Sequence, residues 1–348
     1  MLPGRRRSII MLVAALAPLS GCGGGSAGTA APGQPTKPVT VRLGFFPNIT
    51  HATPLAGVEK GIYADRLRPD KLEVQSFNAG PAAVEALFAE GLDAAYVGPN
   101  PAINAYAKSK GAAIRIISGA TSGGAALVVR STISQPSDLK GGKLASPQLG
   151  GTQDVALRAW LAGQRLRPDT AGGVLVLPQE NAQILETFRS GEIDGAWVPE
   201  PWATRLVQEG SGKVLVDERD LWPAGRFVTT QLVVRTKFLK RHPATVKRLL
   251  EAQVAADELV NGNGPEAQRL ANLGIERITG KKLPEQLLAA AWPNLTFTND
   301  PIATSLTKSA RDAEEVGLLK KVDLTGIYDL APLGEVLAAA GRPPVPAA

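Results

Sequence analysis

Short apolar runs alternate with amphipathic stretches along the first two thirds of the chain. Residues 39–46 and 94–97 are apolar runs of strand length, and 82–90 between them has the spacing of an amphipathic helix that ends at Gly91. Strands that alternate with helices at this spacing predict an α/β fold, with a mostly parallel sheet and helices on both faces. The other predicted strands are 72–77, 114–117, 143–145, 174–177 and 195–198, and the other predicted helices are 54–61, 101–110, 152–162, 182–190, 201–208, 243–261, 265–279, 284–291 and 300–318.

The chain repeats this plan about a hundred positions later. The matched pairs keep their order: Pro47 with Pro147, Phe88 with Phe188, Gly91 with Gly191, Asp93 with Asp194, Pro99 with Pro199 and Pro101 with Pro201. The sequence LVVR ends each half, at 127–130 and 232–235. Chance is the alternative, because Gly and Pro number 37 and 27. The preserved order favours a duplication, and hence two similar lobes that hold a ligand between them.

The chain begins with a targeting segment. Arg5, Arg6 and Arg7 precede an apolar run at 9–19, which is too short to span a membrane. The run ends in Leu-Ser-Gly-Cys, which resembles the lipobox of bacterial lipoproteins and implies cleavage before Cys22 and a diacylglycerol on its sulfur. A plain secretory signal with an incidental cysteine is the alternative. We therefore expect a signal peptide over 1–21 and a flexible tether over 22–38, which is rich in Gly, Ser, Ala, Thr and Pro.

Charge and cysteine content exclude several classes of protein. Without the three leader arginines the chain keeps 35 basic and 32 acidic residues, and this near-neutral balance does not indicate a nucleic-acid-binding protein. Cys22 is the only cysteine, so the mature chain has neither a disulfide nor a free thiol nucleophile. The sequence has no HExxH, no GxSxG and no metal-ligand cluster. We expect no enzyme, no cofactor and no metal.

Four predicted strand-to-helix loops carry hydrogen-bond donors suited to an oxyanion. Such loops lie at the carboxyl ends of strands, where open α/β sheets bind ligands. Glycines there expose backbone N–H groups, and helix N-termini attract anions. Helix capping at 47–51 and an ordinary turn at 98–101 are the alternatives. The candidates are Asn48, Thr50 and His51 in the first loop, Asn100 in the second, Ser122 and Gly123 in the third, and Gly151, Thr152 and Gln153 in the fourth.

A fifth segment, Pro199-Glu200-Pro201-Trp202, differs in charge from the four donor loops, because it carries a carboxylate beside an indole. Glu200 could favour the N-terminus of the following helix electrostatically. It could instead receive the amine of a ligand, with Trp202 covering an alkyl stem. Both interpretations stay open at this point.

Four segments together resemble one protein family. GFFPNITHA, GLDAAYVGPNPAINAYAKSKG, SPQLGGTQDVALR and GEIDGAWVPEPWATRLV are similar to the periplasmic substrate-binding proteins of ABC importers, and to the branch of aliphatic sulfonate, taurine and nitrate binders that is related to NMT1 and Thi5 proteins. The resemblance runs from residue 39 to the C-terminal helices. It implies a type II periplasmic binding protein fold, in which two α/β lobes close on a ligand and the closed form docks on a membrane permease.

The resemblance also divides the chain and orders the hypotheses. Lobe 1 would comprise 39–129 and 236–348, lobe 2 would comprise 130–235, and the two LVVR strands would cross between them. It implies a permease and its ATPase as partners, and together with the lipobox at Cys22 we expect a monomer that is lipid-anchored outside the cytoplasm. The ligand would be a small anion or zwitterion, an aliphatic sulfonate or taurine, and the cleft would contain the candidates above with Glu200 and Trp202.

Three alternatives stay open. The same fold could bind nitrate, a phosphonate or a thiamine-precursor pyrimidine, or the protein could be a surface sensor without transport. A Thi5-like enzyme is the third, although the lipobox argues against it. None of the four donor loops contains Arg or Lys, so the charge of a sulfonate would be only partly compensated.

Overall fold

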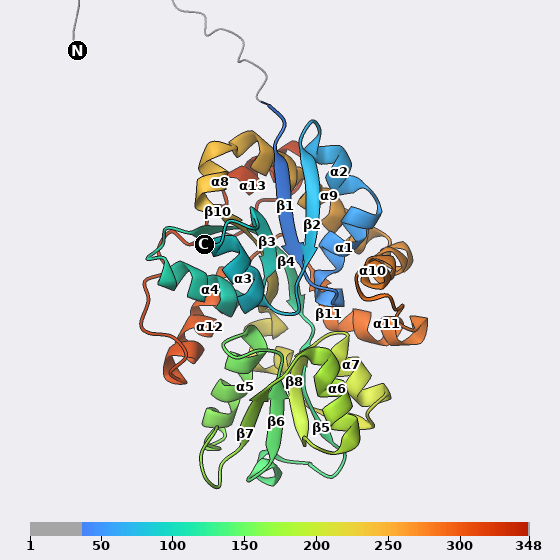
Figure 1. Ribbon diagram of the computed structural model, residues 1–348, viewed down its shortest axis with the longest axis vertical. Helices are drawn as coiled ribbons and strands as arrows, with labels where there is room; N and C mark the ends of the chain where they lie inside the picture. The colour runs from blue at the N-terminus through green and yellow to red at the C-terminus, as the bar shows by residue number, and fades with distance from the viewer. Residues whose placement is uncertain (1–36, 347–348) are drawn as a thin grey trace, which may run out of the picture. The chain divides into compact units, whose positions relative to one another are not determined.

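The apolar runs of the sequence form the strands of two separate sheets in the computed structural model, which describes residues 37–346 (Figure 1). The leader and Cys22 lie outside the described residues. The first sheet has the order β11-β4-β10-β3-β1-β2 and the second the order β7-β6-β8-β5-β9. The strands are β1 (Thr40–Phe45), β2 (Lys71–Ser76), β3 (Ala94–Val97), β4 (Ile114–Gly123), β5 (Ala125–Arg130), β6 (Lys143–Ser146), β7 (Leu175–Pro178), β8 (Gly195–Pro199), β9 (Gly212–Asp217), β10 (Val228–Arg235) and β11 (Leu295–Phe297).

The two sheets share one topology, as the sequence repeat predicts. Strands β2, β1 and β3 run parallel in the first sheet, and β7, β6 and β8 run parallel in the second. One antiparallel strand follows in each sheet, β10 beside β3 and β5 beside β8, and β4 or β9 pairs with its far side. Both sheets are therefore mixed, because three of the five strand pairings in the first sheet and two of the four in the second are antiparallel. This confirms the predicted α/β class, but the expectation of a mostly parallel sheet is wrong.

The matched aspartates hold the same place in both lobes. The carboxylate of Asp93 accepts the N–H of Arg42 at 3.0 Å, and the carboxylate of Asp194 accepts the N–H of Lys143 at 2.7 Å. Each carboxylate therefore binds a backbone N–H of the corresponding parallel strand of its lobe, β1 in the first and β6 in the second.

The lobe boundaries differ from the expected ones. The strand β5, which contains the first LVVR, pairs within the second sheet, and β10, which contains the second LVVR, pairs within the first. The chain thus changes sheet at Gly124 and again between β9 and β10, before each LVVR strand rather than after it. Gly123 and Gly124 have φ of +78° and +74°, which allows the first change of direction. An apolar pattern indicates that a strand exists, but its pairing partner depends on the tertiary fold.

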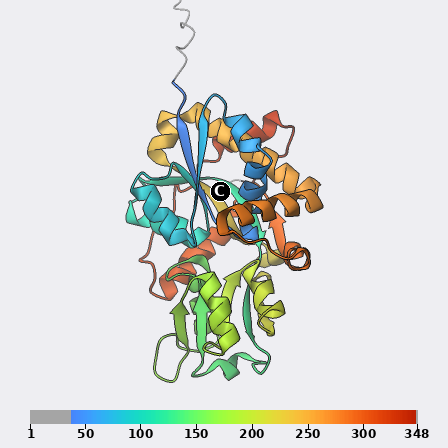
Figure 2. The same cartoon turned by 45° about the vertical axis from the view of Figure 1, so that its right-hand side comes forward.

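Helices cover both faces of each sheet (Figure 2). In the first lobe, α1, α2, α9, α10, α11 and α13 pack on one face, and α3, α4 and α12 on the other. In the second lobe, α5 covers one face, and α6 and α7 cover the other. The α-helices are α1 (Ala52–Glu59), α2 (Ile62–Leu67), α3 (Gly80–Phe88), α4 (Pro99–Lys108), α5 (Thr152–Gly163), α6 (Asn181–Ser190), α7 (Trp202–Gln208), α8 (Thr236–Arg241), α9 (Pro243–Gly262), α10 (Gly264–Thr279), α11 (Glu285–Ala291), α12 (Ala303–Glu315) and α13 (Ala331–Ala339). The short 3₁₀ helices are η1 (Ile49–His51), η2 (Pro136–Leu139), η3 (Glu218–Leu221), η4 (Pro223–Gly225) and η5 (Trp292–Asn294).

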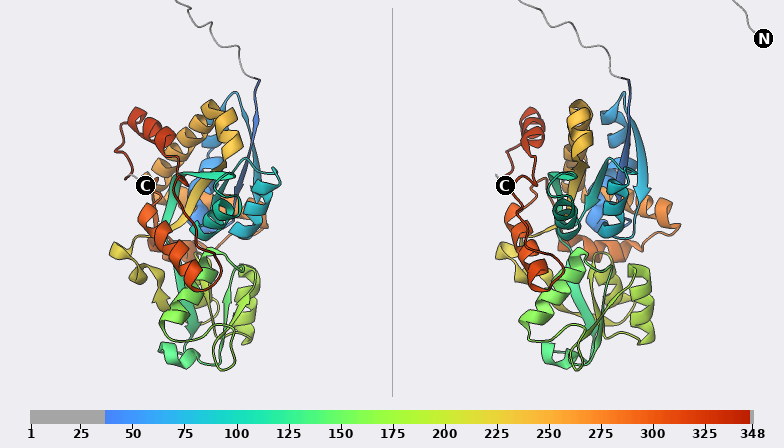
Figure 3. Two further views of the ribbon diagram at one scale, coloured as in Figure 1. Left: turned by 90° about the vertical axis from the view of Figure 1, so that its left-hand side faces the viewer. Right: turned by 60° about the vertical axis from the view of Figure 1, so that its left-hand side comes forward.

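The C-terminal helices return to the first lobe, as expected. Figure 3 shows that α12 also extends to α5 of the second lobe, and the two helices are in contact. Both lobes belong to one compact unit that begins at Pro38. The chain passes from the first sheet to the second at Gly124 and returns between β9 and β10.

Candidate functional site

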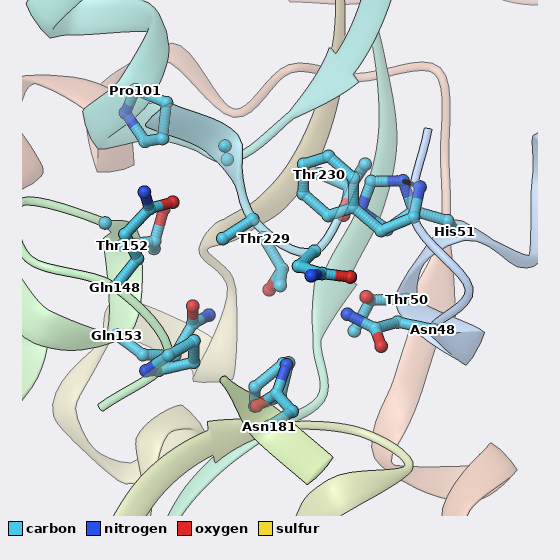
Figure 4. Close-up of a pocket in the computed structure, with 18 residues that line it drawn as sticks. Asn48, Thr50, His51, Pro101, Gln148, Thr152, Gln153, Asn181, Thr229 and Thr230 are labelled. Carbon is cyan, nitrogen blue, oxygen red and sulfur yellow. Dashed lines mark hydrogen bonds between the residues drawn. The ribbon is translucent and has the colours of Figure 1, made fainter. Parts of the chain in front are cut away.

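A pocket lies where the carboxyl ends of strands from both sheets face each other (Figure 4). The loops after β1, β2 and β3 form its lobe 1 side, and the loops after β6 and β7 and the end of β8 form its lobe 2 side. Its volume is about 40 Å³, which holds roughly three water molecules. The polar side chains that line it are Asn48, Thr50, His51, Asn78, Gln148, Thr152, Gln153, Asn181, Thr229 and Thr230.

The loop after β1 is held in place by hydrogen bonds on both sides of the cleft. The Asn48 carbonyl accepts the His51 N–H at 2.9 Å, which turns the chain into η1. The Thr50 carbonyl accepts the hydroxyl of Thr121 on β4 at 2.7 Å. From lobe 2, the Trp202 indole N–H donates to Asn48 Oδ1 at 2.9 Å. Because that oxygen is engaged, the Asn48 amide nitrogen is the group free to face a ligand.

His51 is a neutral donor. Its side chain is only 3% exposed, and burial lowers its pKa to about 3, so the ring is uncharged at neutral pH. Its Nδ1 accepts the Phe46 N–H at 3.4 Å, which places the ring proton on Nε2. The Phe46 ring lies 4.3 Å from the imidazole, centroid to centroid, and fixes its orientation. The pocket therefore receives an N–H from an imidazole that carries no charge.

The glycine loop before α5 is fixed by a buried ion pair. Asp154 accepts the Gly150 N–H at 2.9 Å and the Ser146 hydroxyl at 2.8 Å. Arg158, one turn further along α5, bonds the same carboxylate at 3.1 Å. Gly150 has φ of +71°, which a side chain would disfavour. These contacts hold residues 151–153, the start of α5, against the pocket.

Four helices begin at the pocket. Gly80 and Asn181 are the first residues of α3 and α6, and Gly98 and Gly151 are the N-caps of α4 and α5. The first N–H groups of a helix have no partner within the helix and carry its positive dipole end. None of the described residues that line this pocket carries a formal charge. The arrangement can hold a monoanion through neutral donors and helix N-termini.

The structure brings six of the eleven predicted ligand-binding residues into this lining. They are Asn48, Thr50, His51, Gly151, Thr152 and Gln153. Asn100 does not line it, because its side chain turns into the lobe and donates to the Ser309 carbonyl at 3.1 Å. Ser122 and Gly123 also lie outside, where the Ser122 hydroxyl accepts the Phe227 N–H and the Gly123 carbonyl accepts the Thr229 hydroxyl. These two residues tie the crossing segments together.

Glu200 and Trp202 lie beside the pocket rather than in its wall. Glu200 is 3% exposed, and its carboxylate accepts the Thr204 N–H at 3.1 Å and the Asn294 amide at 2.7 Å. These contacts agree with the interpretation in which Glu200 stabilises the start of the following helix. The same carboxylate does not face the pocket, so it cannot bind the amine of a ligand there. Trp202 does not line the pocket, but its indole N–H donates to Asn48, which does.

Several lining residues were not predicted from the sequence. Asn78 and Gly80 come from the loop between β2 and α3, and Asn181 comes from the matching loop between β7 and α6. The internal repeat could have indicated these residues, because the two loops occupy corresponding positions in the two halves of the sequence. Asn181 is 8% exposed, and its side-chain oxygen has no hydrogen-bond partner among the described residues. Thr229 and Thr230, which also line the pocket, lie on β10.

The described residues offer neither a metal cluster nor a helix suited to a membrane span. Residues 37–346 contain no group of three His, Cys, Asp or Glu side chains that could hold a metal ion. Within the same range, no helix combines the length and the apolar character that a membrane span requires.

Several known proteins resemble this chain in sequence or in fold. The taurine-binding periplasmic protein of Escherichia coli is 27% identical over 270 residues, which cover 76% of this chain and 79% of that protein. The solved alkanesulfonate-binding protein SsuA of Xanthomonas axonopodis pv. citri, bound to MOPS, superposes with a TM-score of 0.71 at 19% identity, over 85% of this chain and 100% of that one. The nitrate-binding protein NrtA of Synechocystis superposes with a TM-score of 0.71 at 18% identity, over 88% of this chain and 90% of that one.

Two α/β lobes of one topology, exchanging a strand around a shared cleft, define a type II periplasmic binding protein fold, as the resemblance implied. The model of the NMT1-like family matches residues 34–274, and the chain belongs to that family. The named relatives are binding proteins rather than enzymes, which agrees with the expectation of a non-enzymatic role. Their periplasmic setting implies an extracytoplasmic location for this chain.

Proposed function

We propose that this chain is the lipid-anchored, solute-binding subunit of an ABC importer and captures a small monovalent oxyanion, an aliphatic sulfonate or taurine, by closure of its two lobes. The observation that carries the proposal is the uncharged lining of the pocket, on which four helix N-termini converge. A sulfonate spreads one negative charge over three oxygens, which suits several neutral donors. A phosphonate dianion would find no cation to balance its second charge.

The choice between the two sulfonates depends on the amine of taurine. A buried ammonium requires a partner of opposite charge. Glu200, the carboxylate that the sequence offered for this role, is occupied by Thr204 and Asn294 and lies outside the lining. This arrangement supports an alkanesulfonate without an amine over taurine. Nitrate is the second candidate, because the small volume of the pocket suits a four-atom anion.

Alanine replacements at the pocket test the proposal. Replacing Thr152 or His51 by alanine removes a donor from the lining and is expected to weaken sulfonate binding about tenfold or more. Calorimetry on the soluble form that starts after Cys22 measures this, with methanesulfonate, taurine, nitrate and methylphosphonate as ligands. The control is Thr132→Ala, a replacement at an exposed threonine of lobe 2. Unchanged affinity in both pocket variants would remove these residues from the site, and binding of methylphosphonate alone would contradict the proposed ligand class.

The pH dependence of binding provides a second prediction. Because the pKa of His51 is lowered to about 3, the ring stays neutral from pH 5.5 to pH 8, and methanesulfonate affinity is expected to change by less than about twofold over this range. Titrations at both pH values measure it. An affinity about tenfold higher at pH 5.5 would mean that a charged imidazole holds the anion.

A deletion of the gene tests whether the protein takes part in transport. Loss of sulfonate uptake would indicate an importer subunit, and unchanged uptake would indicate a sensor.

A further inference from the structure

A group of exposed cations lies at the edge of lobe 1 that is opposite the cleft. The pocket lies at the carboxyl ends of β1, β2 and β3, so the amino ends of these parallel strands lie at the far edge of the sheet. The helices α2 and α8 and the start of β1 also lie at this end of the molecule (Figure 1). The exposed cations there, which define the basic edge, are Arg66, Lys71, Lys110, Lys240 and Arg241.

Hydrogen bonds join the segments that carry these cations into one surface. The Asp70 carboxylate, at the start of β2, accepts the Val39 N–H at 3.0 Å and the Thr245 hydroxyl at 2.6 Å, so β2, β1 and the first turn of α9 meet there. The Thr236 N–H donates to the Ala113 carbonyl at 2.8 Å, so the loop between α4 and β4 lies beside α8. Because α9 follows α8 directly, both groups of contacts belong to one edge of the lobe.

The positive charge of the basic edge is not balanced by nearby carboxylates. The acidic residues of this region are each matched by another cation: Asp65 by Arg68 at 3.1 Å, Glu90 by Lys237 at 3.2 Å, and Glu73 by Arg42, its cross-strand neighbour in β1. Within residues 37–346, none of the five cations of the basic edge forms an ion pair. The edge therefore carries a local excess of positive charge, although the chain without its leader arginines has 35 basic and 32 acidic residues.

The basic edge exposes charge, whereas the large apolar side chains of its helices are buried. In α8, Phe238 and Leu239 are buried, and Lys240 and Arg241 are exposed. In α2, the ring of Tyr63 is buried in the same way. Such a surface lacks the apolar centre of a stable protein–protein interface, and it suits a partner that presents many diffuse negative charges.

We propose that the basic edge rests on the anionic phospholipid headgroups of the membrane to which the chain is anchored. The inference rests on the lipid anchor of the proposed function, because Cys22 precedes Pro38, where the compact unit begins, by sixteen positions. An extended chain of that length spans at most roughly 55 Å, so an anchored protein keeps this edge within reach of the bilayer. Contact there leaves the pocket, at the opposite ends of the same strands, facing away from the membrane.

Vesicle binding by the soluble form that starts after Cys22 tests the surface without its anchor. We expect this form to sediment with vesicles of equal parts phosphatidylglycerol and phosphatidylcholine at about 20 mM salt. It should be released at about 500 mM salt, where the Debye length has fallen from roughly 20 Å to about 4 Å. Vesicles of phosphatidylcholine alone should not bind it. Failure to bind the anionic vesicles at low salt, or equal binding to both kinds, would overturn the inference.

Two matched triple variants locate the contact. The first removes three cations of the basic edge and combines Lys71→Gln, Lys240→Gln and Arg241→Gln. The second removes three exposed cations from the end of lobe 2 that is remote from the cleft and combines Lys140→Gln, Arg165→Gln and Arg167→Gln. Because both variants lose the same net charge, only the position of the charge differs between them.

The first variant is expected to bind the anionic vesicles roughly a hundredfold more weakly, at about fivefold for each cation, and the second to change by less than about threefold. Equal losses in the two variants would mean that net charge alone attracts the protein, and would overturn the assignment to the basic edge.

Calorimetry with methanesulfonate separates this inference from the proposed ligand. Both triple variants are expected to keep the wild-type affinity, because all six positions lie outside the pocket. A wild-type protein that binds the sulfonate but no anionic vesicles would refute the membrane contact and leave ligand capture standing. A protein that binds the anionic vesicles but no sulfonate would support the membrane contact and contradict the proposed ligand.

Discussion

Replacing Gly98 by valine is expected to weaken ligand binding roughly a hundredfold and to leave the unligated protein as stable as the wild type. A Cβ atom on Gly98, the N-cap of α4 in lobe 1, would lie 2.1 Å from Thr152 Oγ1 of lobe 2. Within its own lobe the same atom would lie 3.3 Å from the Thr229 carbonyl oxygen, a contact that a small shift relieves. The added side chain therefore clashes when the lobes meet, and the open form tolerates it.

The magnitude follows from the balance between open and closed forms. A ligand gripped by donors of both lobes binds only as tightly as closure allows, and a penalty of about 3 kcal/mol on the closed form lowers affinity about a hundredfold. The backbone at Gly98 has φ of −73° and ψ of 170°, which valine adopts readily, so no local strain is added.

Calorimetry with methanesulfonate, together with thermal unfolding of the unligated protein, checks this prediction. Gly163→Val is the matched control, because Gly163 ends α5 in lobe 2 and a Cβ there meets no atom within 4 Å. Its affinity is expected to equal that of the wild type. Wild-type affinity in Gly98→Val would show that ligand binding does not require the lobes to meet at Thr152.

The elements of the fold were predictable from the sequence because their patterns are local. The strand at 94–97 and the helices near 152–162 and 243–261 appear almost where their periodicity indicated. The sheet assignment of β5 and β10 was not predictable in this way, since both are equally apolar and only contacts distant in sequence select their partners. The edge strand β9 was missed because polar residues flank its short apolar run.

The loops that form the site were predictable from the sequence, because the topology of the fold determines where they lie. The carboxyl ends of parallel strands gather at one edge, so the loops at 47–51 and 150–154 had to meet once both sheets faced the cleft. Side-chain direction is a different matter. Asn100 begins a helix at the cleft but turns toward α12, because the N-terminal turn of α4 presents its side chains around the whole helix. Asn78 and Asn181 follow β2 and β7, which were predicted, but nothing in the sequence around either asparagine indicates that its side chain faces the cleft.

A buried carboxylate lies where the chain returns from lobe 2 to lobe 1. Glu218 begins η3 directly after β9, is only 2% exposed, and accepts the indole N–H of Trp197 on β8 at 2.7 Å. From lobe 1, the Lys308 ammonium lies 4.6 Å from the centroid of the nearby Trp222 ring. Burial raises the pKa of Glu218 to about 7, although the Trp197 hydrogen bond acts in the opposite direction. The folded protein therefore retains a proton here that the unfolded chain releases near the ordinary glutamate pKa of 4.5.

The substitution Glu218→Gln is accordingly expected to stabilise the protein at pH 8 and to have little effect at pH 4.5. Between the unfolded pKa of 4.5 and the folded pKa of about 7, the folded state binds more protons, so wild-type stability falls as pH rises, by about 3 kcal/mol in total. Glutamine cannot ionise and keeps an oxygen for the Trp197 N–H, so it avoids this loss, and Tm at pH 8 should rise by several degrees. Urea unfolding at both pH values, with the exposed Glu192→Gln as control, measures the difference. A variant destabilised equally at both values would mean that the ionised carboxylate is well solvated in the fold, and that the return segment owes its order to that charge.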